Sequence, residues 1–311
     1  KHLEAYQWIL FDQLHNATLI GSVSVDSHIK RRVLILDSMR SSELMKIPEH
    51  DISVWSSAIE SVIAHTQDCC VDQAIVLKST SSTMDEVREH DELANNFLVV
   101  AMSQTAGRGQ RGRHWDDGSE KTLPCTFVID TSQIQVNVLS TLVACAVHQT
   151  IRGVVPDSTR VMIKWPNDII VREGDFQHDR KIAGILIEQK GNQAHIGIGI
   201  NCTQHLKDWS PEIHGRAISL SETGVQVSRI DLVCNLIEQM SGWIHQNNPE
   251  SVQRYFQSHD AMINTLRTFH VGHEQYTGVV KIIEPFECIV IQNGMGSHRL
   301  PIAQTQHVRS D

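Results

Sequence analysis

The chain has 311 residues, of which 41% are hydrophobic and 20% charged, so its composition is that of a globular protein with room for two or three domains. Its formal net charge of −9 argues against a nucleic-acid-binding protein, which usually carries a basic excess, but not against a local basic loop that binds an anion. No apolar run reaches the roughly 18 residues that a membrane-spanning helix needs, so we expect no membrane partner.

The seven cysteines are scattered and mostly set in apolar runs, which is typical of reduced, buried thiols in an intracellular protein. Adjacent Cys69 and Cys70 form neither a CxxC motif nor a metal pair, and the 18 histidines include no HExxH spacing. We therefore expect no zinc site. We expect a cytoplasmic location, with the mitochondrion left open because the sequence begins at Lys1 and a targeting segment upstream could have been removed.

Residues 1–70 carry the weakest structural signals, and we treat them as an N-terminal extension of unclear role. The apolar run at 33–36 predicts a strand, and residues 51–64 combine an N-cap residue with apolar residues at helical spacing. No convincing helix-turn-helix pattern is present, and the chain is acidic overall. Both observations argue against DNA binding by the extension.

The pattern becomes clearer from residue 71 onward. Apolar runs predict strands at 74–77, 97–102, 126–129 and 161–164. Helical spacing predicts helices at 84–93, 135–154 and 230–245. A hairpin is predicted from 182–188 and 195–200, joined at 190–192, and short strands with glycine turns are predicted at 278–283, 288–292 and 296–300. The fold class is therefore α+β: a mixed sheet with helices, followed by a small β-barrel-like tail.

A loop that alternates glycine and arginine follows the predicted strand 97–102 and ends at Trp115. Glycine lets the backbone approach a ligand closely, and arginine offers a planar set of donors that suits phosphates and carboxylates. A solvated basic loop is the alternative. The position of this segment at a strand end, before an aromatic residue, favours instead a loop that closes over an anion and excludes water.

The segment Lys164-Trp165-Pro166-Asn167-Asp168 follows another predicted strand. It reads as an ordinary turn, but a residue before proline is held extended, which would fix Lys164 and Asn167 rigidly. Asn and Asp side chains can orient a nucleotide and its hydrated Mg²⁺. Lys181 lies at the mouth of the predicted strand 182–188, either as a surface residue or, as we favour, as a catalytic cation.

Three further groups are candidates for contact with a ligand. The hydroxyls at 81–83 could cap the following helix, and that role can coexist with ligand binding. Gln104 could hydrogen-bond an amide or ureido group. Gly197 and Gly199, in a predicted strand, permit close approach of a ring or a backbone.

The segments 107–115, 164–168, 181–186 and 199–201 resemble, in order and spacing, the biotin protein ligase family, also called holocarboxylase synthetases. The resemblance runs from about residue 74 to 240 and is weaker in the C-terminal tail. It implies a class II synthetase-like, biotin- and ATP-binding catalytic domain at residues 71–262 and a C-terminal SH3-like domain at 263–311.

The resemblance also implies a two-step reaction that uses ATP, biotin and Mg²⁺. The biotin carboxylate would first join the α-phosphate of ATP, giving biotinyl-5′-AMP and pyrophosphate. Biotin would then pass to one lysine of a biotin carrier domain in a biotin-dependent carboxylase. A homodimer is left open as a further partner.

The resemblance assigns roles to individual residues. The residues implied to bind biotin are Ser82, Thr83, Met84, Gln104, Arg108, Gly109, Gln110, Lys181 and Gly184. Those implied to bind ATP are Arg108, Arg111, Arg113, Trp115, Lys164, Asn167, Asp168, Lys181 and Asn201. Lys181 and Arg108 are the implied catalytic residues, and Asp168 is the implied metal ligand.

Two positions depart from the family pattern. Gln110 stands where bacterial members usually carry arginine, and Met84 stands where asparagine is common. The hydroxyl turn therefore has a second candidate at Ser79-Thr80. Two other functions remain as alternatives: a lipoate–protein ligase or octanoyl transferase, which would lack the Lys-Trp-Pro-Asn-Asp segment, and a biotin-responsive repressor that reads DNA through residues 1–70.

Overall fold

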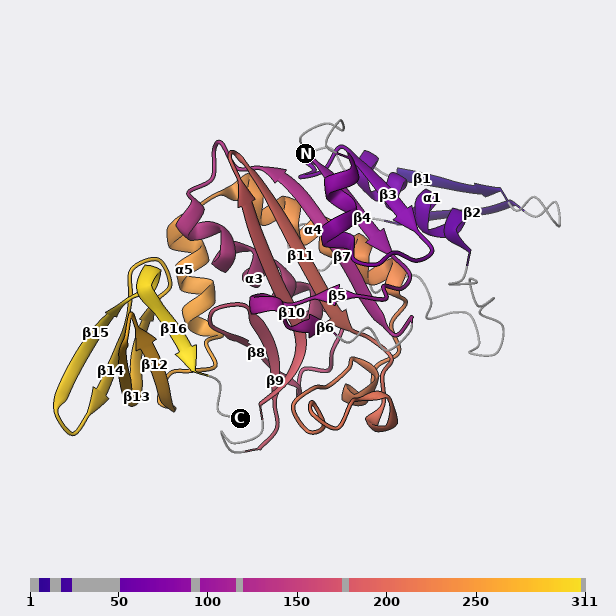
Figure 1. Ribbon diagram of the computed structural model, residues 1–311. Coiled ribbons are helices and arrows are strands. Elements are labelled where there is room, and N and C mark those ends of the chain that lie inside the picture. Colours follow the sequence, from indigo (N-terminus) through magenta and orange to yellow (C-terminus); the bar gives the residue numbers. More distant parts are fainter. Residues whose placement is uncertain are drawn as a thin grey trace. The chain divides into compact units, whose positions relative to one another are not determined.

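The structure is a computed structural model that describes residues 6–11, 18–23, 51–90, 96–115, 120–174 and 179–308 (Figure 1). The chain divides into two compact units at residues 46 and 47. In the first unit, β1 (Tyr6–Phe11) and β2 (Thr18–Val23) form an antiparallel hairpin. The strand predicted at 33–36 lies outside the described residues.

The second unit contains a seven-stranded sheet in the order β3-β4-β7-β11-β10-β9-β8. Its first two strands are parallel, and every other neighbouring pair is antiparallel. This sheet confirms the mixed sheet of the predicted α+β fold. The strands are β3 (Gln73–Leu77), β4 (Phe97–Ala101), β7 (Thr122–Asp130), β8 (Arg160–Lys164), β9 (Asp168–Arg172), β10 (Asp179–Lys190) and β11 (Gln193–Asn201).

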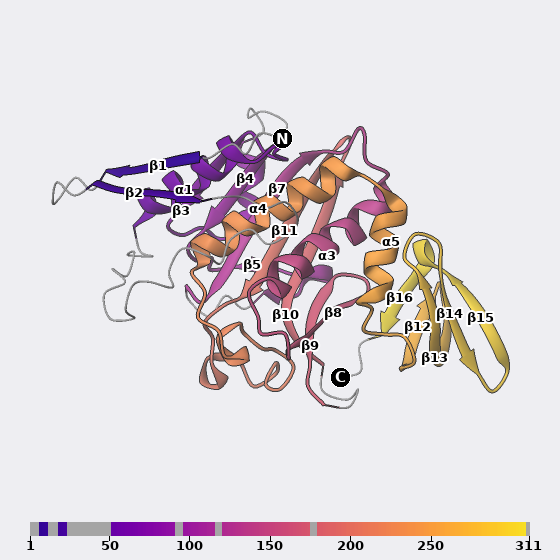
Figure 2. The same cartoon turned by 180° about the vertical axis from the view of Figure 1, so that it is seen from behind.

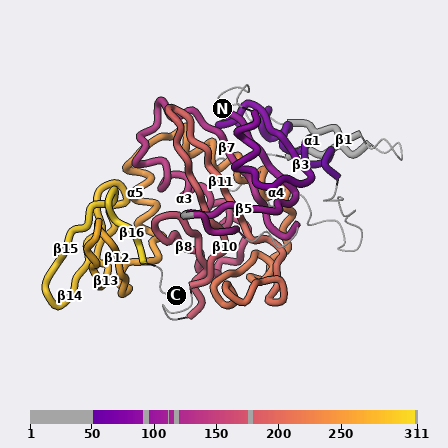
Figure 3. The backbone as a smooth tube through the Cα atoms, viewed as in Figure 1, coloured from indigo at the N-terminus to yellow at the C-terminus, as the bar shows by residue number. Residues whose placement is uncertain are grey.

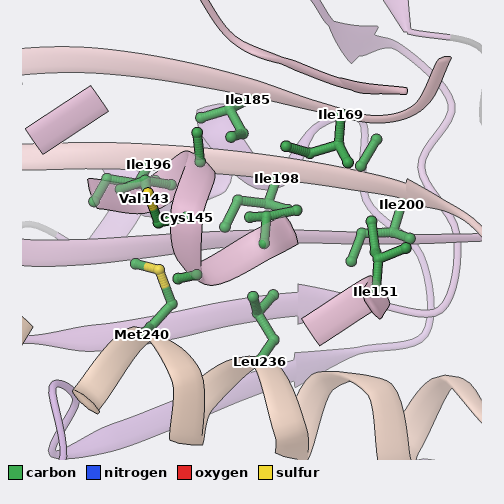
Figure 4. Packing of buried hydrophobic residues seen from close by; sticks show 14 of the residues in the cluster. Val143, Cys145, Ile151, Ile169, Ile185, Ile196, Ile198, Ile200, Leu236 and Met240 are labelled. Carbon is green, nitrogen blue, oxygen red and sulfur yellow. The ribbon is translucent and has the colours of Figure 1, made fainter. Parts of the chain in front are cut away.

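Alternation along β11 gives the sheet one apolar face and one open face. Ile196, Ile198 and Ile200 are buried, whereas Gly197 and Gly199 stand between them and belong to the opposite face. The isoleucines pack against α3 (Val136–Arg152) and α4 (Arg229–Gln246), as Figure 4 shows with Val143, Cys145, Leu236 and Met240. The two helices lie in front of the sheet in Figure 2, and β5 (Gly107–Arg108) crosses the other face in Figure 1.

Capping residues set where the helices begin. Asp51 accepts a hydrogen bond from Ser53 N (2.9 Å) at the start of α1 (Ile52–His65), and Ser228 caps α4 in the same way. Trp55 of α1 is fully buried in the core of the second unit. The helix predicted at 51–64 is therefore confirmed, but it packs with the large sheet, although the sequence grouped it with the N-terminal extension.

In three places before the C-terminal sheet, the structure differs from the sequence prediction. In place of a helix at 84–93 there are a short α2 (Thr83–Glu86) and a 3₁₀ turn η1 (Val87–His90). Strand β9 begins at Asp168, inside the segment read as a turn. Helix α5 (Pro249–Ser258) was not predicted, although Asn248 caps it and proline occupies its first position.

A five-stranded antiparallel sheet follows α5, in the order β15-β14-β13-β12-β16. Its strands are β12 (Leu266–Val271), β13 (Glu274–Glu284), β14 (Cys288–Asn293), β15 (Gly296–Pro301) and β16 (Thr305–Val308). The strands predicted at 278–283, 288–292 and 296–300 are confirmed as β13, β14 and β15, whereas β12 and β16 were not predicted. Phe269, Ile289 and Leu300 form part of its buried side. This sheet lies beside α5 in Figures 1 and 2, and the chain can be followed into it in Figure 3.

All seven cysteines are free thiols, and five of them are buried, as the sequence predicted. Burial raises the pKa of the Cys70 thiol to about 12, so it stays protonated at neutral pH. Among the described residues, no helix is long and apolar enough to cross a membrane.

Candidate functional site

A cavity of about 500 Å³ lies on the open face of the large sheet. This volume is in the range of ordinary small-molecule sites. Its lining includes Gly184 of β10 and its register partner Gly199 of β11, together with Gly197. The glycine–arginine loop, the turn at 82–84 and the C-terminal strands β12 and β16 supply the other walls.

The three glycines are needed because other side chains lie directly on their backbones. A Cβ at Gly199 would stand 2.5 Å from Trp115 Cε2, and one at Gly184 would stand 2.7 Å from Trp115 Cζ3. A Cβ at Gly197 would stand 2.7 Å from Met84 Sδ. Of the two glycines predicted to permit close approach of a ring, Gly199 lies under the Trp115 ring and Gly197 lies under the Met84 side chain.

Lys181 is fixed at the cavity by its backbone and by its charge. Its N–H donates to Arg216 O (2.7 Å), and its carbonyl accepts from Ile218 N (3.0 Å). Asn201 Nδ2 donates to the same carbonyl (3.1 Å). The ammonium Nζ lies 2.6 Å from Asp168 Oδ1 and 5.0 Å from the centre of a Trp115 ring. Gly184, Gly197 and Gly199 together form the glycine floor of the cavity. The contacts of Lys181 place a positive charge above this floor.

Asn167 joins the turn after β8 to strand β10. Its carbonyl accepts from Ile185 N (3.0 Å), and its Nδ2 donates to Ile185 O (2.8 Å). The preceding Trp165–Pro166 peptide bond is cis. Asn167 Oδ1 is buried and has no hydrogen-bond partner among the described residues. A buried amide oxygen of this kind suits a ligand donor or a hard cation such as Mg²⁺.

The acidic groups at the site are few. Asp168 is 7% exposed and already forms an ion pair with Lys181. The described residues contain no cluster of three or more His, Cys, Asp or Glu side chains that could hold a metal ion by themselves. This donor set fits a Mg²⁺ that keeps most of its water and phosphate ligands, because that ion uses only one or two protein carboxylates.

The glycine–arginine loop forms a short hairpin and a turn over the cavity. Gly107 of β5 pairs with Trp115 of β6 (His114–Trp115), and Gly109 N donates to Arg113 O (2.8 Å) across the 3₁₀ turn η2 (Gln110–Gly112). The structure does not describe the side chain of Arg111. The expectation that this loop opens and closes stays a prediction.

The hydroxyl turn places Ser82 and Thr83 on the cavity wall, whereas Ser79 and Thr80 are not part of the lining. Ser82 is the N-cap of α2, but its side chain makes no capping hydrogen bond, so its hydroxyl is not used as a cap. Thr83 N donates to Gln104 Oε1 (3.3 Å), which fixes the amide beside the turn. A Cβ at Gly107 would stand 2.6 Å from Gln104 Nε2.

The cavity brings together every residue that the sequence proposed for biotin, and part of the set proposed for ATP. Its lining includes Ser82, Thr83, Met84, Gln104, Arg108, Gly109, Gln110, Lys181 and Gly184 from the first set, and Arg113, Trp115 and Asn167 from the second. The second set also contains Lys164, Asp168 and Asn201, which are not part of the lining. Asn201 instead fixes the backbone of Lys181 from behind.

Sequence reasoning missed the contribution of the C-terminal sheet. His270 of β12 and residues 305–308 of β16 line the same cavity. They follow the motif segments by about 70 residues or more, and no local signal connects them to the site. Cys125 also lines the cavity, and burial raises the pKa of its thiol far above its usual range, so the thiol stays protonated at neutral pH.

Comparisons with known proteins agree with this arrangement. The sequence model of the biotin/lipoate A/B protein ligase family matches residues 74–204. The bifunctional ligase/repressor BirA of Escherichia coli is 28% identical over 211 residues, which cover 65% of this chain and 63% of BirA. The biotin--[acetyl-CoA-carboxylase] ligase of Mycobacterium tuberculosis is 26% identical over 198 residues, which cover 61% of this chain and 71% of that protein.

The matched lengths are partial. BirA of Bacillus subtilis is 32% identical over 170 residues, which cover 52% of this chain and 50% of that protein, so the chain spans half to less than two thirds of the BirA relatives it matches. Among solved structures, the biotin protein ligase of Aquifex aeolicus in complex with biotin and ATP has a TM-score of 0.65 and 23% identity, over 76% of this chain and 99% of that chain. This likeness shows that the fold is shared.

Proposed function

This chain belongs to the biotin protein ligase family, and from that premise we propose that it is an ATP-dependent biotin ligase. It forms biotinyl-5′-AMP and transfers biotin to a lysine of a biotin carrier domain in a carboxylase. The observation that carries the proposal is the single cavity lined by all nine residues proposed for biotin, with the Lys181 ammonium beside its glycine floor.

In the first step, a carboxylate oxygen of biotin attacks the α-phosphorus of ATP. A new P–O bond forms, the bond to the bridging oxygen of the β-phosphate breaks, and pyrophosphate leaves. Negative charge grows on the non-bridging oxygens, and a cation already in place stabilises it. Lys181 supplies that cation: three hydrogen bonds hold its backbone, and Asp168 lies 2.6 Å from its ammonium.

When bound, Mg²⁺ would neutralise charge on the triphosphate, with Asn167 Oδ1 and Asp168 as the oxygen groups nearest to hold it. The loop at 107–115 would cover the acyl-adenylate and exclude water until the acceptor arrives. In the second step, a neutral lysine amine of the carrier attacks the acyl carbon and forms a C–N bond. The C–O bond to phosphate breaks, AMP leaves with the electron pair, and the proton lost from the amine passes to a phosphate oxygen or to water.

The direct test is to incubate the full chain with biotin, ATP, Mg²⁺ and a purified biotin carrier domain, and to measure the intact mass of the carrier. We expect one biotin, minus one water, to be added to the carrier only when ATP is present. Parallel reactions with lipoate and octanoate separate this function from that of the lipoate branch of the family. Modification by lipoate in place of biotin, or no modification at all, would overturn the proposal.

A further inference from the structure

Four charged side chains form a closed ring next to the cavity. Arg108 donates through Nη1 to Asp85 Oδ1 (2.9 Å) and through Nη2 to Glu188 Oε1 (2.6 Å). Arg88 donates to the same two residues, to Asp85 Oδ1 (3.0 Å) and to Glu188 Oε2 (2.9 Å). Each carboxylate therefore has two arginine partners, and each arginine has two carboxylate partners.

Arg108 is the member of this ring that belongs to the cavity lining; Asp85, Arg88 and Glu188 do not. Both of its terminal nitrogens already donate to carboxylates. A ligand carboxylate or phosphate uses the same donors in the same geometry. Asp85 and Glu188 therefore compete with a bound anion for Arg108.

Arg88 lowers the free energy needed to release Arg108 from the two carboxylates. When Arg108 turns toward an anion, Asp85 and Glu188 keep Arg88 as their partner at the distances given above. Without Arg88, the same turn would leave two neighbouring carboxylates, 42% and 33% exposed, with no arginine partner among the described residues. Their negative charge would then hold Arg108 more tightly in the ring.

We infer that Asp85 and Glu188 form a latch for Arg108, and that Arg88 is a positioning residue that allows the latch to release it to the ligand. This inference rests on the proposed function, because biotin is taken as the anion that Arg108 contacts. It predicts opposite effects of the two kinds of ring residue on ligand affinity. Arg88 promotes binding, and the two carboxylates oppose it.

The test is isothermal titration of the full chain with biotin at low ionic strength. We expect Arg88→Gln to raise the Kd by about two- to fivefold, the range that partly exposed ion pairs allow. Asp85→Asn/Glu188→Gln lowers the Kd or leaves it unchanged, and Arg88→Lys restores most of the affinity. Glu188→Gln alone gives the same comparison if the double carboxylate variant does not fold.

The triple variant separates the latch from a general effect of charge. In the Asp85→Asn/Glu188→Gln background, Arg88→Gln has no further effect on the Kd if it acts through the latch. The matched control is Arg152→Gln, which removes an arginine that pairs with Asp157 at the end of α3. We expect that variant to bind biotin as the unmodified chain does.

Two results would contradict the inference that Asp85 and Glu188 form a latch for Arg108. One is an unchanged Kd for Arg88→Gln, and the other is an equal loss of affinity for Arg88→Gln with and without the two carboxylates. Failure of the unmodified chain to bind biotin at all would count against the proposed function and would be seen before any variant is compared.

Discussion

At the scale of single residues, Trp115 is the least expected member of the site. The family resemblance places it on the nucleotide, but its ring lies on Gly184 and Gly199, and Gly184 was proposed for biotin. Its indole Nε1 is buried and has no hydrogen-bond partner among the described residues. An unpaired buried donor of this kind costs free energy, so a ligand acceptor that pairs with Nε1 favours movement of the indole.

The glycine floor gives the first residue-scale prediction. Gly199→Ala places a methyl group where the Trp115 ring now lies, and the same methyl group occupies the surface over which a ligand ring would lie. Overpacking of about 1–3 kcal/mol corresponds to a rise of about fivefold or more in the KM for biotin. The measurement is biotin-dependent pyrophosphate exchange, with circular dichroism to check the fold.

Gly242→Ala is the matched control for that substitution. Gly242 lies within α4, and a Cβ there meets no atom within 4 Å. The same chemical change should leave the KM as it is. Equal KM values for the two variants would show that the glycine floor is not where the substrate lies.

At the scale of elements, α3 and α5 are joined by a polar cluster around the buried His148. His148 of α3 donates through Nε2 to Val161 O (3.1 Å), so its Nδ1 accepts from Tyr255 Oη of α5 (2.9 Å). The His259 ring lies 4.4 Å from both the His148 and Tyr255 rings. Val161 belongs to β8, the strand that leads to the Asn167 turn. This cluster therefore supports one wall of the site from behind.

The cluster makes stability depend on pH. Burial lowers the pKa of His148 from 6.5 to about 4, because the charged ring would lose its water, and the charges of His259 and Arg152 lower it as well. Its stabilising contribution is therefore complete above about pH 6.5 and is lost as the pH falls toward 4. A shift of this size corresponds to about 3 kcal/mol.

Urea unfolding at several pH values checks this second prediction. Between pH 6.5 and pH 4, the free energy of unfolding should fall more steeply for the unmodified chain than for His148→Gln, which keeps a donor for Val161 O. Other histidines titrate in both proteins, so the difference between the two slopes is the quantity to compare. Parallel slopes would mean that His148 is not buried in its neutral form.

At the scale of the whole second unit, the C-terminal sheet is tied to the strand that carries Lys181. Asp179 of β10 forms ion pairs with Arg172 (2.7 Å) and with Arg267 of β12 (3.4 Å). Arg172 also donates to Ala261 O (2.6 Å). Asp179 stands two residues before Lys181, so the contact that anchors the C-terminal sheet also anchors the strand that carries Lys181.

Local patterns were enough to predict the motif residues and the long elements. Ile196, Ile198 and Ile200 alternate with glycines, and this alternation already separates a core face from a face open to a ligand. Strand β9 was missed because the signal of Pro166 and Asn167 for a turn outweighed the short apolar run after it.

The contacts that could not be predicted are non-local. Arg108 and Glu188 are 80 residues apart in sequence, and Arg108 and Asp85 are 23 residues apart, so only the folded sheet brings the ring of charges together. His270 reaches the cavity through a second sheet whose strand β12 carries no strong apolar pattern. The sequence identified Arg108 as a site residue but did not indicate its partners Asp85 and Glu188.

The central claim is that the cavity above the glycine floor joins biotin to ATP and that Lys181 stabilises the charge that develops. Exchange of labelled pyrophosphate into ATP measures that first step alone, and it is best run on Lys181→Ala beside the unmodified chain, with Lys190→Ala as a control on the same strand. We expect exchange that requires biotin, persists in Lys190→Ala and falls about 10²- to 10³-fold in Lys181→Ala. Exchange that proceeds without biotin, or a Lys181→Ala protein as active as the unmodified one, would contradict it.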